Sequence, residues 1–230
     1  MRIRITFAKQ GALRYTGNLD LHKLWERSAR RADLALAYSQ GFHPQPKIQL
    51  AAALPLGFSS RCELVDMRVA GEVELAALPQ RLQAAVPPGL KIIKVEEIDE
   101  SSPPLQTRII AAEYEVTLFD KVDEDQLSQS IAAVLAAESL PRERRGKPYD
   151  LRPLIEDLRL TPAPTFPPFP QPEAGSFPET QRGNGGMTGG LFMRLAAREG
   201  ATGRPEEVLS ALGIEYEGTR VERTKFIFRE

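Results

Sequence analysis

Two consecutive strand-like segments, KIQLAAAL at residues 47–54 and CELVDMRVA at residues 62–70, decide the fold that this sequence predicts. Alternation of apolar and polar residues, clearest in the second segment, is typical of strands that bury one face. A turn around residues 55–60, with the sequence Pro-Leu-Gly-Phe-Ser-Ser, joins the two. The elements on either side of this pair then determine the topology.

Those flanking elements complete a repeating order. Residues 2–8 alternate as a strand does, and residues 19–33 have the spacing of an amphipathic helix with Asn18 as its N-cap. A second helix at 73–85 ends at a Pro-Pro-Gly sequence, and a strand at 90–98 follows it. The order of strand, helix, strand, strand, helix, strand is the ferredoxin-like split βαβ pattern.

The second half begins the same order again after a polar, proline-containing linker at 99–106. We therefore predict an α+β protein of two tandem ferredoxin-like units with antiparallel sheets, the first at residues 1–102 and the second at 103–230. Residues 161–190 hold seven prolines and six glycines, too many for regular structure. This stretch is expected to be a mobile surface insertion or, alternatively, a docking strand for a partner. The remaining elements expected in the second half are a strand at 112–119, a helix at 123–138, strands at 150–160 and 191–197, a helix opening at Pro205 and a strand at 220–229.

Composition favours a cytoplasmic globular protein. The chain has 230 residues, of which 42% are hydrophobic and 27% charged. No apolar run reaches the roughly 18 to 20 residues of a membrane span, and the first residues lack the apolar centre of a signal peptide. The single cysteine, Cys62, excludes an internal disulfide and a cysteine-ligated iron–sulfur cluster, which needs about four thiolates. We expect no cofactor and no metal.

Charge is distributed unevenly along the chain. Residues 1–60 contain nine Lys or Arg against three Asp or Glu, although the net charge of the whole chain is −1. A basic segment of this kind favours an anionic partner such as nucleic acid or phosphate.

The basic residues concentrate on one face of the helix predicted at 19–33. At 100° per residue, its lysine and arginines lie away from the apolar face that carries Leu21 and Trp25. Cationic side chains interleaved with aromatic rings hold phosphates and stack bases, although a basic helix face is as often only a solvated surface. The candidate substrate-binding residues are Arg14, Tyr15, Asp20, Lys23, Arg27, Arg30, Arg31, Tyr38, Phe42, His43 and Lys47.

Prolines restrict the segment after that helix. Pro44 and Pro46 keep His43 and Gln45 extended, either to present the imidazole on a rigid loop or only to shape the entry to a strand. A His22, His43 and Asp20 metal set is disfavoured, because Asp20 and His22 lie on different sides of the helix. No catalytic residue is assigned.

A smaller basic cluster occurs in the second half, where Arg142, Arg144, Arg145 and Lys147 precede Tyr149. An exposed approach to a hairpin is favoured somewhat over an anion-binding surface as the explanation of this cluster.

Several motifs resemble the radical SAM-linked protein family, a domain family of unknown function. They are RYTGNLD at 14–20, YSQGFHPQPKI at 38–48, YDLRPLI at 149–155 and ERT at 222–224. The resemblance covers most of the chain except the proline-rich stretch. It implies an accessory role beside a radical SAM iron–sulfur protein. This chain carries Gly17-Asn18 where the family tends to carry Ser-His.

The function we expect is that of an accessory protein, without enzymatic activity or with weak activity, that binds an anionic substrate such as RNA for a radical SAM partner. RNA is favoured over duplex DNA because ferredoxin-like sheets often present rings to unpaired bases, an argument from fold alone. Two alternatives remain open. One is an enzyme acting on RNA or a phosphorylated metabolite through His43, Asp20 and the arginines, and the other is a protein-interaction scaffold.

Overall fold

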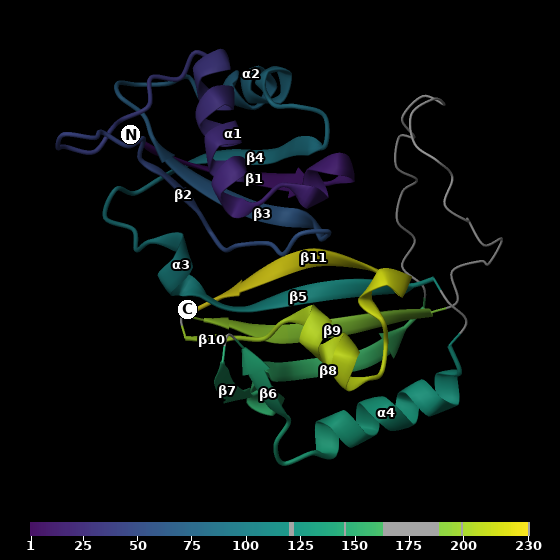
Figure 1. The fold of residues 1–230 in the computed structure, drawn as a ribbon. Helices are drawn as coiled ribbons and strands as arrows, with labels where there is room; N and C mark the ends of the chain where they lie inside the picture. The colour runs from purple at the N-terminus through teal and green to yellow at the C-terminus, as the bar shows by residue number, and fades with distance from the viewer. Residues whose placement is uncertain (120–121, 145, 163–188, 199, 230) are drawn as a thin grey trace, which may run out of the picture. The chain divides into compact units, whose positions relative to one another are not determined.

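A computed structural model describes residues 1–119, 122–144, 146–162, 189–198 and 200–229. The chain forms two compact units (Figure 1). The first comprises Met1–Ile110 together with the C-terminal segment Arg223–Glu230, and the second comprises Ala111–Glu222. The sequence prediction placed the division between residues 102 and 103 and assigned the C-terminal strand to the second unit.

The first unit has the predicted order of strand, helix, strand, strand, helix, strand. Strand β1 pairs antiparallel with both β3 and β4, and β2 pairs antiparallel with β3, so the strand order is β4-β1-β3-β2. Helices α1 and α2 lie on the same side of this sheet (Figure 1). The elements are β1 (Arg2–Lys9), α1 (Asn18–Arg31), β2 (Ile48–Leu50), β3 (Ser59–Arg68), α2 (Leu78–Ala85), β4 (Leu90–Ile98) and the short helix α3 (Leu105–Arg108).

Alternation along β1 builds the core of this unit. Ile3, Ile5 and Phe7 are completely buried under the helices. The indole of Trp25 from α1 meets the Phe7 ring edge to face, with ring centroids 4.8 Å apart. This contact fixes which side of α1 faces the sheet, and therefore which side faces the solvent.

Several predicted boundaries in the first unit were wrong. Helix α1 begins at Asn18 and its N-cap is Gly17, so Asn18 is the first helical residue and not the cap. The helix ends before Asp33, which takes a left-handed backbone with φ of 54°. Helix α2 begins at residue 78 and not at 73, because Pro79 is tolerated only in the first turn of a helix. The strand predicted at 47–54 is also shorter, with β2 only three residues long.

Side chains cover the outer edge of β2. The Ile48 carbonyl oxygen lies 3.3 Å from Nε2 of His22, and the Leu50 carbonyl accepts a hydrogen bond of 3.1 Å from Nε2 of Gln106. Such contacts satisfy an edge that otherwise pairs with another strand.

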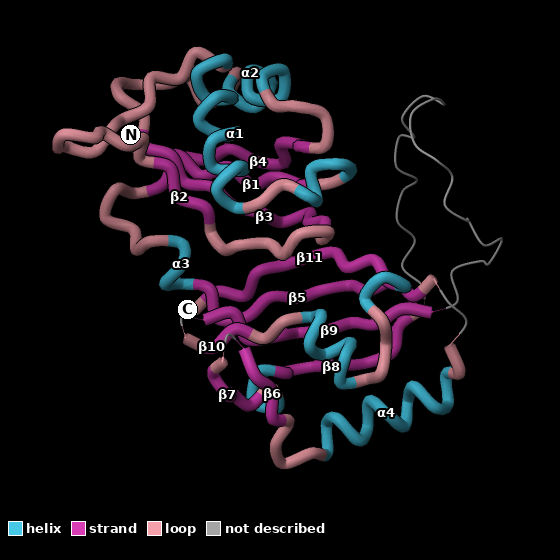
Figure 2. The backbone as a smooth tube through the Cα atoms, in the orientation of Figure 1, coloured by secondary structure: helices cyan, strands magenta, loops and turns pink. Residues whose placement is uncertain are grey.

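The second unit is also built on antiparallel strands, with β9 between β5 and β8 and with β10 paired to the end of β9. A separate two-stranded hairpin, β6–β7, precedes β8. Figure 2 shows these strands and the loops that join them. The elements are β5 (Ile109–Leu118), α4 (Glu124–Ala136), β6 (Pro141–Arg144), β7 (Lys147–Asp150), β8 (Ile155–Thr161), β9 (Gly189–Arg198), β10 (Ala201–Thr202), α5 (Pro205–Ala211) and β11 (Thr219–Phe228), whose last residues belong to the first unit.

Local chemistry accounts for most of these boundaries. The Asp123 carboxylate caps α4 by accepting hydrogen bonds of 3.0 Å from the amides of Asp125 and Gln126. The single strand predicted at 150–160 is interrupted, because a 3₁₀ turn at Arg152–Leu154 separates β7 from β8. Pro153 in that turn has no amide hydrogen for a ladder.

The predicted α+β class with mostly antiparallel strands is confirmed. Within the described part of the chain, no helix is long and apolar enough to cross a membrane. Most of the predicted insertion at 161–190 lies outside the described residues, which resume at 189.

Candidate functional site

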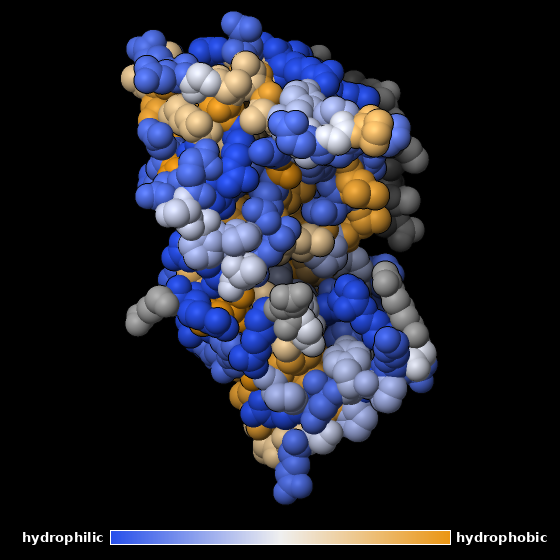
Figure 3. All heavy atoms as spheres, turned by 90° about the vertical axis from the view of Figure 1, so that its left-hand side faces the viewer, coloured by the Kyte–Doolittle hydropathy of each residue, from blue (hydrophilic) through white to orange (hydrophobic). Residues whose placement is uncertain are grey.

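The exposed face of α1 carries the predicted basic residues. Lys23, Arg27, Arg30 and Arg31 are all exposed, whereas Trp25 on the opposite face is completely buried. In the space-filling view of Figure 3, hydrophilic side chains predominate on the visible face and hydrophobic ones form smaller groups.

Two of these four cations already have partners. Nη2 of Arg30 donates to the Glu26 carboxylate at 2.6 Å and to the Tyr38 hydroxyl at 3.1 Å. The bond to Tyr38, with a smaller contribution from Glu26, raises the pKa of Arg30 above its usual value. Sequence reasoning missed the ion pair, although the four-residue spacing between Glu26 and Arg30 is a known signal for one.

Arg31 donates to the Ser28 hydroxyl at 3.3 Å. Lys23 and Arg27 have neither a hydrogen bond nor an ion pair with any residue that the structure describes. These two cations are therefore the ones available to an anionic ligand.

Residues 37–47 form a hydrogen-bonded hairpin, here called the 37–47 hairpin. The Ser39 amide donates to the Gln45 carbonyl and the Lys47 amide donates to the Ala37 carbonyl, both at 2.8 Å. The Tyr38 hydroxyl accepts from Arg30 and so ties the hairpin to α1. Sequence analysis expected a rigid loop here without identifying these bonds.

The tip of the 37–47 hairpin presents an aromatic ring to solvent. Phe42 has a relative exposure of 102%, and His43 beside it is also exposed. Gly41 precedes the ring with φ of 126°, a conformation that other residues rarely adopt. Phe42 makes no contribution to the core.

Arg14 and Tyr15 form a separate pair before α1. Nη2 of Arg14 donates to the Tyr15 hydroxyl at 2.8 Å, and its guanidinium carbon lies 4.8 Å from the ring centroid. Tyr15 is 62% exposed, and Asp20 is exposed in the first turn of α1. The structure shows no hydrogen bond or ion pair between Asp20 and His43, both of which it describes.

Lys47, the last residue of the 37–47 hairpin, is exposed and also borders the sheet of the first unit. It lines an open cavity of about 280 Å³ together with Arg2, Gln49, Asp66 and Arg68. The register of β1 on β3, which pairs Arg2 with Arg68, brings these cations together. No pattern in the sequence predicts the register of β1 on β3.

His22 has a structural role in the described chain. Its contact with the Ile48 carbonyl places it on the wall of an open cavity of about 330 Å³, beside Asn18 and Gln106. The ring covers the β2 edge.

A buried group of charges in the first unit was also missed. Lys9, Glu63 and Arg223 are each at most 2% exposed. Nζ of Lys9 donates to the Thr16 carbonyl at 2.8 Å, and Nη1 of Arg223 lies 3.6 Å from Oε1 of Glu63. Burial lowers the pKa of Lys9, an effect that the Glu63 carboxylate opposes.

Cys62 lies next to this group in the sequence, and its thiol is unreactive. Burial, followed by the nearby Glu63 charge, raises the pKa of its thiol to about 12. Because the thiolate is the reactive form, the thiol is protonated and poorly nucleophilic near neutral pH.

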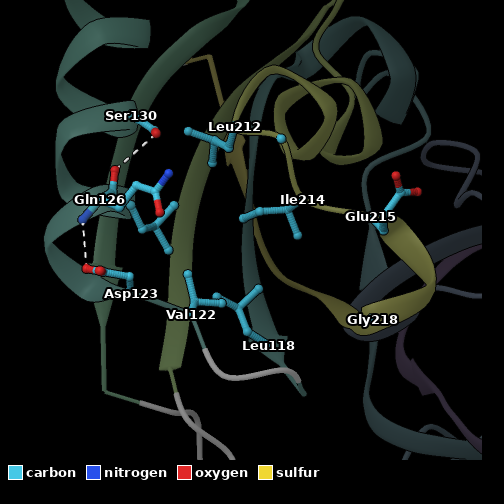
Figure 4. Close-up of a pocket in the computed structure, with 11 residues that line it drawn as sticks. Leu118, Val122, Asp123, Gln126, Ser130, Leu212, Ile214, Glu215 and Gly218 are labelled. Carbon is cyan, nitrogen blue, oxygen red and sulfur yellow. Dashed lines mark hydrogen bonds between the residues drawn. The ribbon is translucent and has the colours of Figure 1, made fainter.

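The second unit has a cavity with both polar and apolar lining residues between α4 and the segment after α5 (Figure 4). Its volume is about 380 Å³. The hydroxyl of Ser130 donates to the Gln126 carbonyl in α4, so it is already satisfied within the helix. The side chains that face one another across this cavity include Leu118, Val122, Gln126, Leu212 and Ile214.

Comparisons with known proteins give a family without an assigned function. No curated protein matches the chain. Among solved structures, the crystal structure of an unknown protein from Galdieria sulphuraria matches with 17% sequence identity, covering 98% of each chain at a TM-score of 0.25. That score supports no statement about fold or function. A family described as "Uncharacterized protein conserved in bacteria (DUF2344)" matches residues 2–183. Since this match spans well over half of the sequence, the chain belongs to the DUF2344 family.

Proposed function

We propose that this chain is a cytoplasmic accessory protein that binds single-stranded RNA for a radical SAM iron–sulfur protein. The RNA would lie on the basic face of α1 and the 37–47 hairpin. The radical SAM partner is inferred from the sequence motifs alone. The observation that carries RNA binding is the fully exposed Phe42 ring on a hydrogen-bonded hairpin that is tied to α1, the helix whose exposed face carries the unpaired Lys23 and Arg27.

A single exposed apolar residue is common on protein surfaces. Phe42 differs because its backbone belongs to a hairpin that is anchored to α1 through Arg30 and Tyr38. A ring held in this way loses little conformational entropy when a base stacks on it. Stacking of a base on an aromatic side chain contributes about 1–3 kcal/mol and tolerates any base.

Two cations on α1 provide contacts for the phosphates of the RNA. Lys23 and Arg27 lie four residues apart on the exposed face of α1, so their side chains are neighbours. Both are free to neutralise successive phosphates of a nucleic acid strand. Arg30 acts differently, since it holds the hairpin in place.

The strand order of each unit supports the ferredoxin-like fold that we propose for both. In the first unit the order β4-β1-β3-β2 is fully antiparallel, as a split βαβ fold requires. In the second, the antiparallel order β8-β9-β5 corresponds to three of the four strands of such a fold, with α4 and α5 following their strands as the fold requires. The face of β1 opposite the core carries Arg2, Arg4 and Thr6 and no ring. We therefore assign base stacking to the 37–47 hairpin and not to the sheet.

The double change Lys23→Gln and Arg27→Gln tests the phosphate contacts. It should weaken binding of a fluorescent single-stranded RNA and reduce the slope of log K against log salt by about 1.4, or about 0.7 per lost contact. Folding should be unaffected, because exposed charges contribute at most about 1 kcal/mol each. Fluorescence anisotropy over a series of salt concentrations measures both quantities.

A matched control is the double change Lys91→Gln and Lys225→Gln, which removes two exposed lysines of the same unit outside the proposed surface. It should leave the salt slope nearly unchanged. RNA binding that is absent from the wild type at low salt, or equal in the Lys23/Arg27 variant, would contradict the proposal.

Phe42→Ala separates stacking from charge. It should reduce the affinity for RNA by about 1–3 kcal/mol, roughly 5- to 150-fold, with little change in the salt slope. Phe42→Tyr keeps an aromatic face and should retain most of the affinity. The same anisotropy titration checks both variants, and equal affinity of Phe42→Ala and wild type would remove the ring from the proposed site.

The same experiments discriminate the two alternatives. Turnover of RNA or of a phosphorylated metabolite by the isolated chain, lost on changing His43, would favour the enzyme. If the chain binds a purified radical SAM protein tightly but does not bind RNA, the protein-interaction scaffold would be favoured.

A further inference from the structure

The second basic cluster of the sequence lies on the β6–β7 hairpin beside an open cavity. Arg145, one of its four cations, is outside the described residues. The cavity has a volume of about 580 Å³, within the range of small-ligand sites. The side chains that matter for its chemistry are Arg144, Lys147, Tyr149, Leu154, Thr202 and Arg204.

The register of the hairpin gathers cations on one face. Arg142 is paired with Tyr149 and Arg144 with Lys147. Because side chains alternate along a strand, these four project from the same face and Glu143 projects from the other. Like charges directly opposite each other destabilise a strand pair, so Arg144 and Lys147 repel across the hairpin.

Nearby acids do not neutralise this repulsion. Nε of Arg142 is 3.9 Å from Glu207, and Nη1 of Arg204 is 3.2 Å from Glu206. In each pair the carboxylate neutralises its own arginine, so neither carboxylate is left to pair with Arg144 or Lys147.

The remaining acid of the cavity, Asp150, keeps its negative charge, but one of its carboxylate oxygens is bound to backbone amides and the structure gives it no ion pair with Arg144 or Lys147. Oδ1 of Asp150 accepts from the amides of Leu140 and Arg152 at 2.8 and 2.9 Å, which lowers the pKa of this carboxyl group. Arg144 and Lys147 have no ion-pair partner among the residues that the structure describes. Their two positive charges are left at the mouth of the cavity.

We propose that this cavity binds a phosphate monoester of nucleotide size, with Arg144 and Lys147 holding the phosphate. An arginine presents paired donors to phosphate oxygens and a lysine acts as a point charge, so the two complement each other. Tyr149 places a hydroxyl donor on the same cavity, and the buried Leu154 offers apolar surface to the rest of the ligand. The Thr202 hydroxyl already donates to the Arg198 carbonyl at 3.3 Å, so it is left as an acceptor. The site lies within the second unit and does not depend on the RNA-binding proposal.

Isothermal titration of the full chain with uridine 5′-monophosphate tests the site. We expect saturable binding, competition by inorganic phosphate and no binding of uridine, which lacks the phosphate. Affinity should decline between pH 7.5 and pH 5, because a phosphate monoester loses its second negative charge around pH 6. Binding of uridine as tight as that of the monophosphate, or no binding of the monophosphate at millimolar concentration, would overturn the proposal.

The double change Arg144→Gln and Lys147→Gln should weaken binding at least about tenfold, since each charged hydrogen bond contributes about 1.5–3 kcal/mol. The melting temperature should stay the same or rise, because the cross-strand repulsion disappears. The control Lys91→Gln and Lys225→Gln should bind like wild type. An equal loss in this control would show attraction by overall charge and not by the cavity. RNA binding at α1 should survive in the Arg144/Lys147 variant, so the two proposals fail separately.

Discussion

Replacement of Asp66 by Ala is expected to lower the free energy of unfolding of the first unit by about 3–5 kcal/mol. Asp66 is 3% exposed and its carboxylate holds two arginines. It accepts a bond of 2.7 Å from Arg2, and bonds of 2.8 and 3.0 Å from Arg4. Its removal leaves the buried Arg2 guanidinium without its carboxylate, and that uncompensated charge is the source of the large effect.

Urea unfolding followed by tryptophan fluorescence measures this loss. Trp25 is the only tryptophan of the chain and is completely buried against Phe7, so its emission reports the first unit. Glu100→Ala is the matched control, because Glu100 pairs with Arg68 at 2.7 Å but its side chain is 51% exposed. The control should cost less than about 1 kcal/mol. A cost of that size for Asp66→Ala as well would mean that the buried ion pairs contribute nothing net.

Gly89→Ala should destabilise the same unit by about 2–5 kcal/mol. Gly89 has φ of 94°, and a Cβ added there would lie 2.7 Å from the Gln10 carbonyl oxygen and 3.3 Å from the Leu13 side chain. The Gln10 amide donates to the Gly89 carbonyl at 2.8 Å, so the two segments cannot separate without losing that bond. Both backbone strain and steric overlap therefore oppose the new methyl group.

Gly71→Ala measures the backbone strain alone, so the difference between the two variants gives the steric part. Gly71 has a similar φ of 77°, but a Cβ there would meet no atom within 4 Å. It should cost only the strain of a left-handed alanine, about 1–2 kcal/mol. Equal destabilisation by the two variants in the same urea experiment would show that the approach of Gln10 to Gly89 is unimportant.

Sequence periodicity predicted the elements that local chemistry controls. The strand at 90–98 was predicted with the bounds that β4 has, because the Pro-Pro-Gly sequence ends the helix and the strand follows directly after it. The exposed positions of α1 also followed from helical spacing, since Trp25 must face the core. Predictions failed where tertiary contacts end an element, as at β2, whose outer edge is covered by His22 and Gln106.

The sequence by itself determined which segments are basic and which face of α1 carries the charge, because that face depends on the local period of the helix. Only the tertiary structure decided which cations have partners. Arg4 meets Asp66 through the register of β1 on β3, whereas Arg144 meets Lys147 through the register of β6 on β7. Strand register depends on turn geometry and on burial of one whole face, and a shift of one residue would reverse every side chain. The positions of the charged residues can therefore be predicted from the sequence, whereas the carboxylate partners that neutralise them are set by the fold.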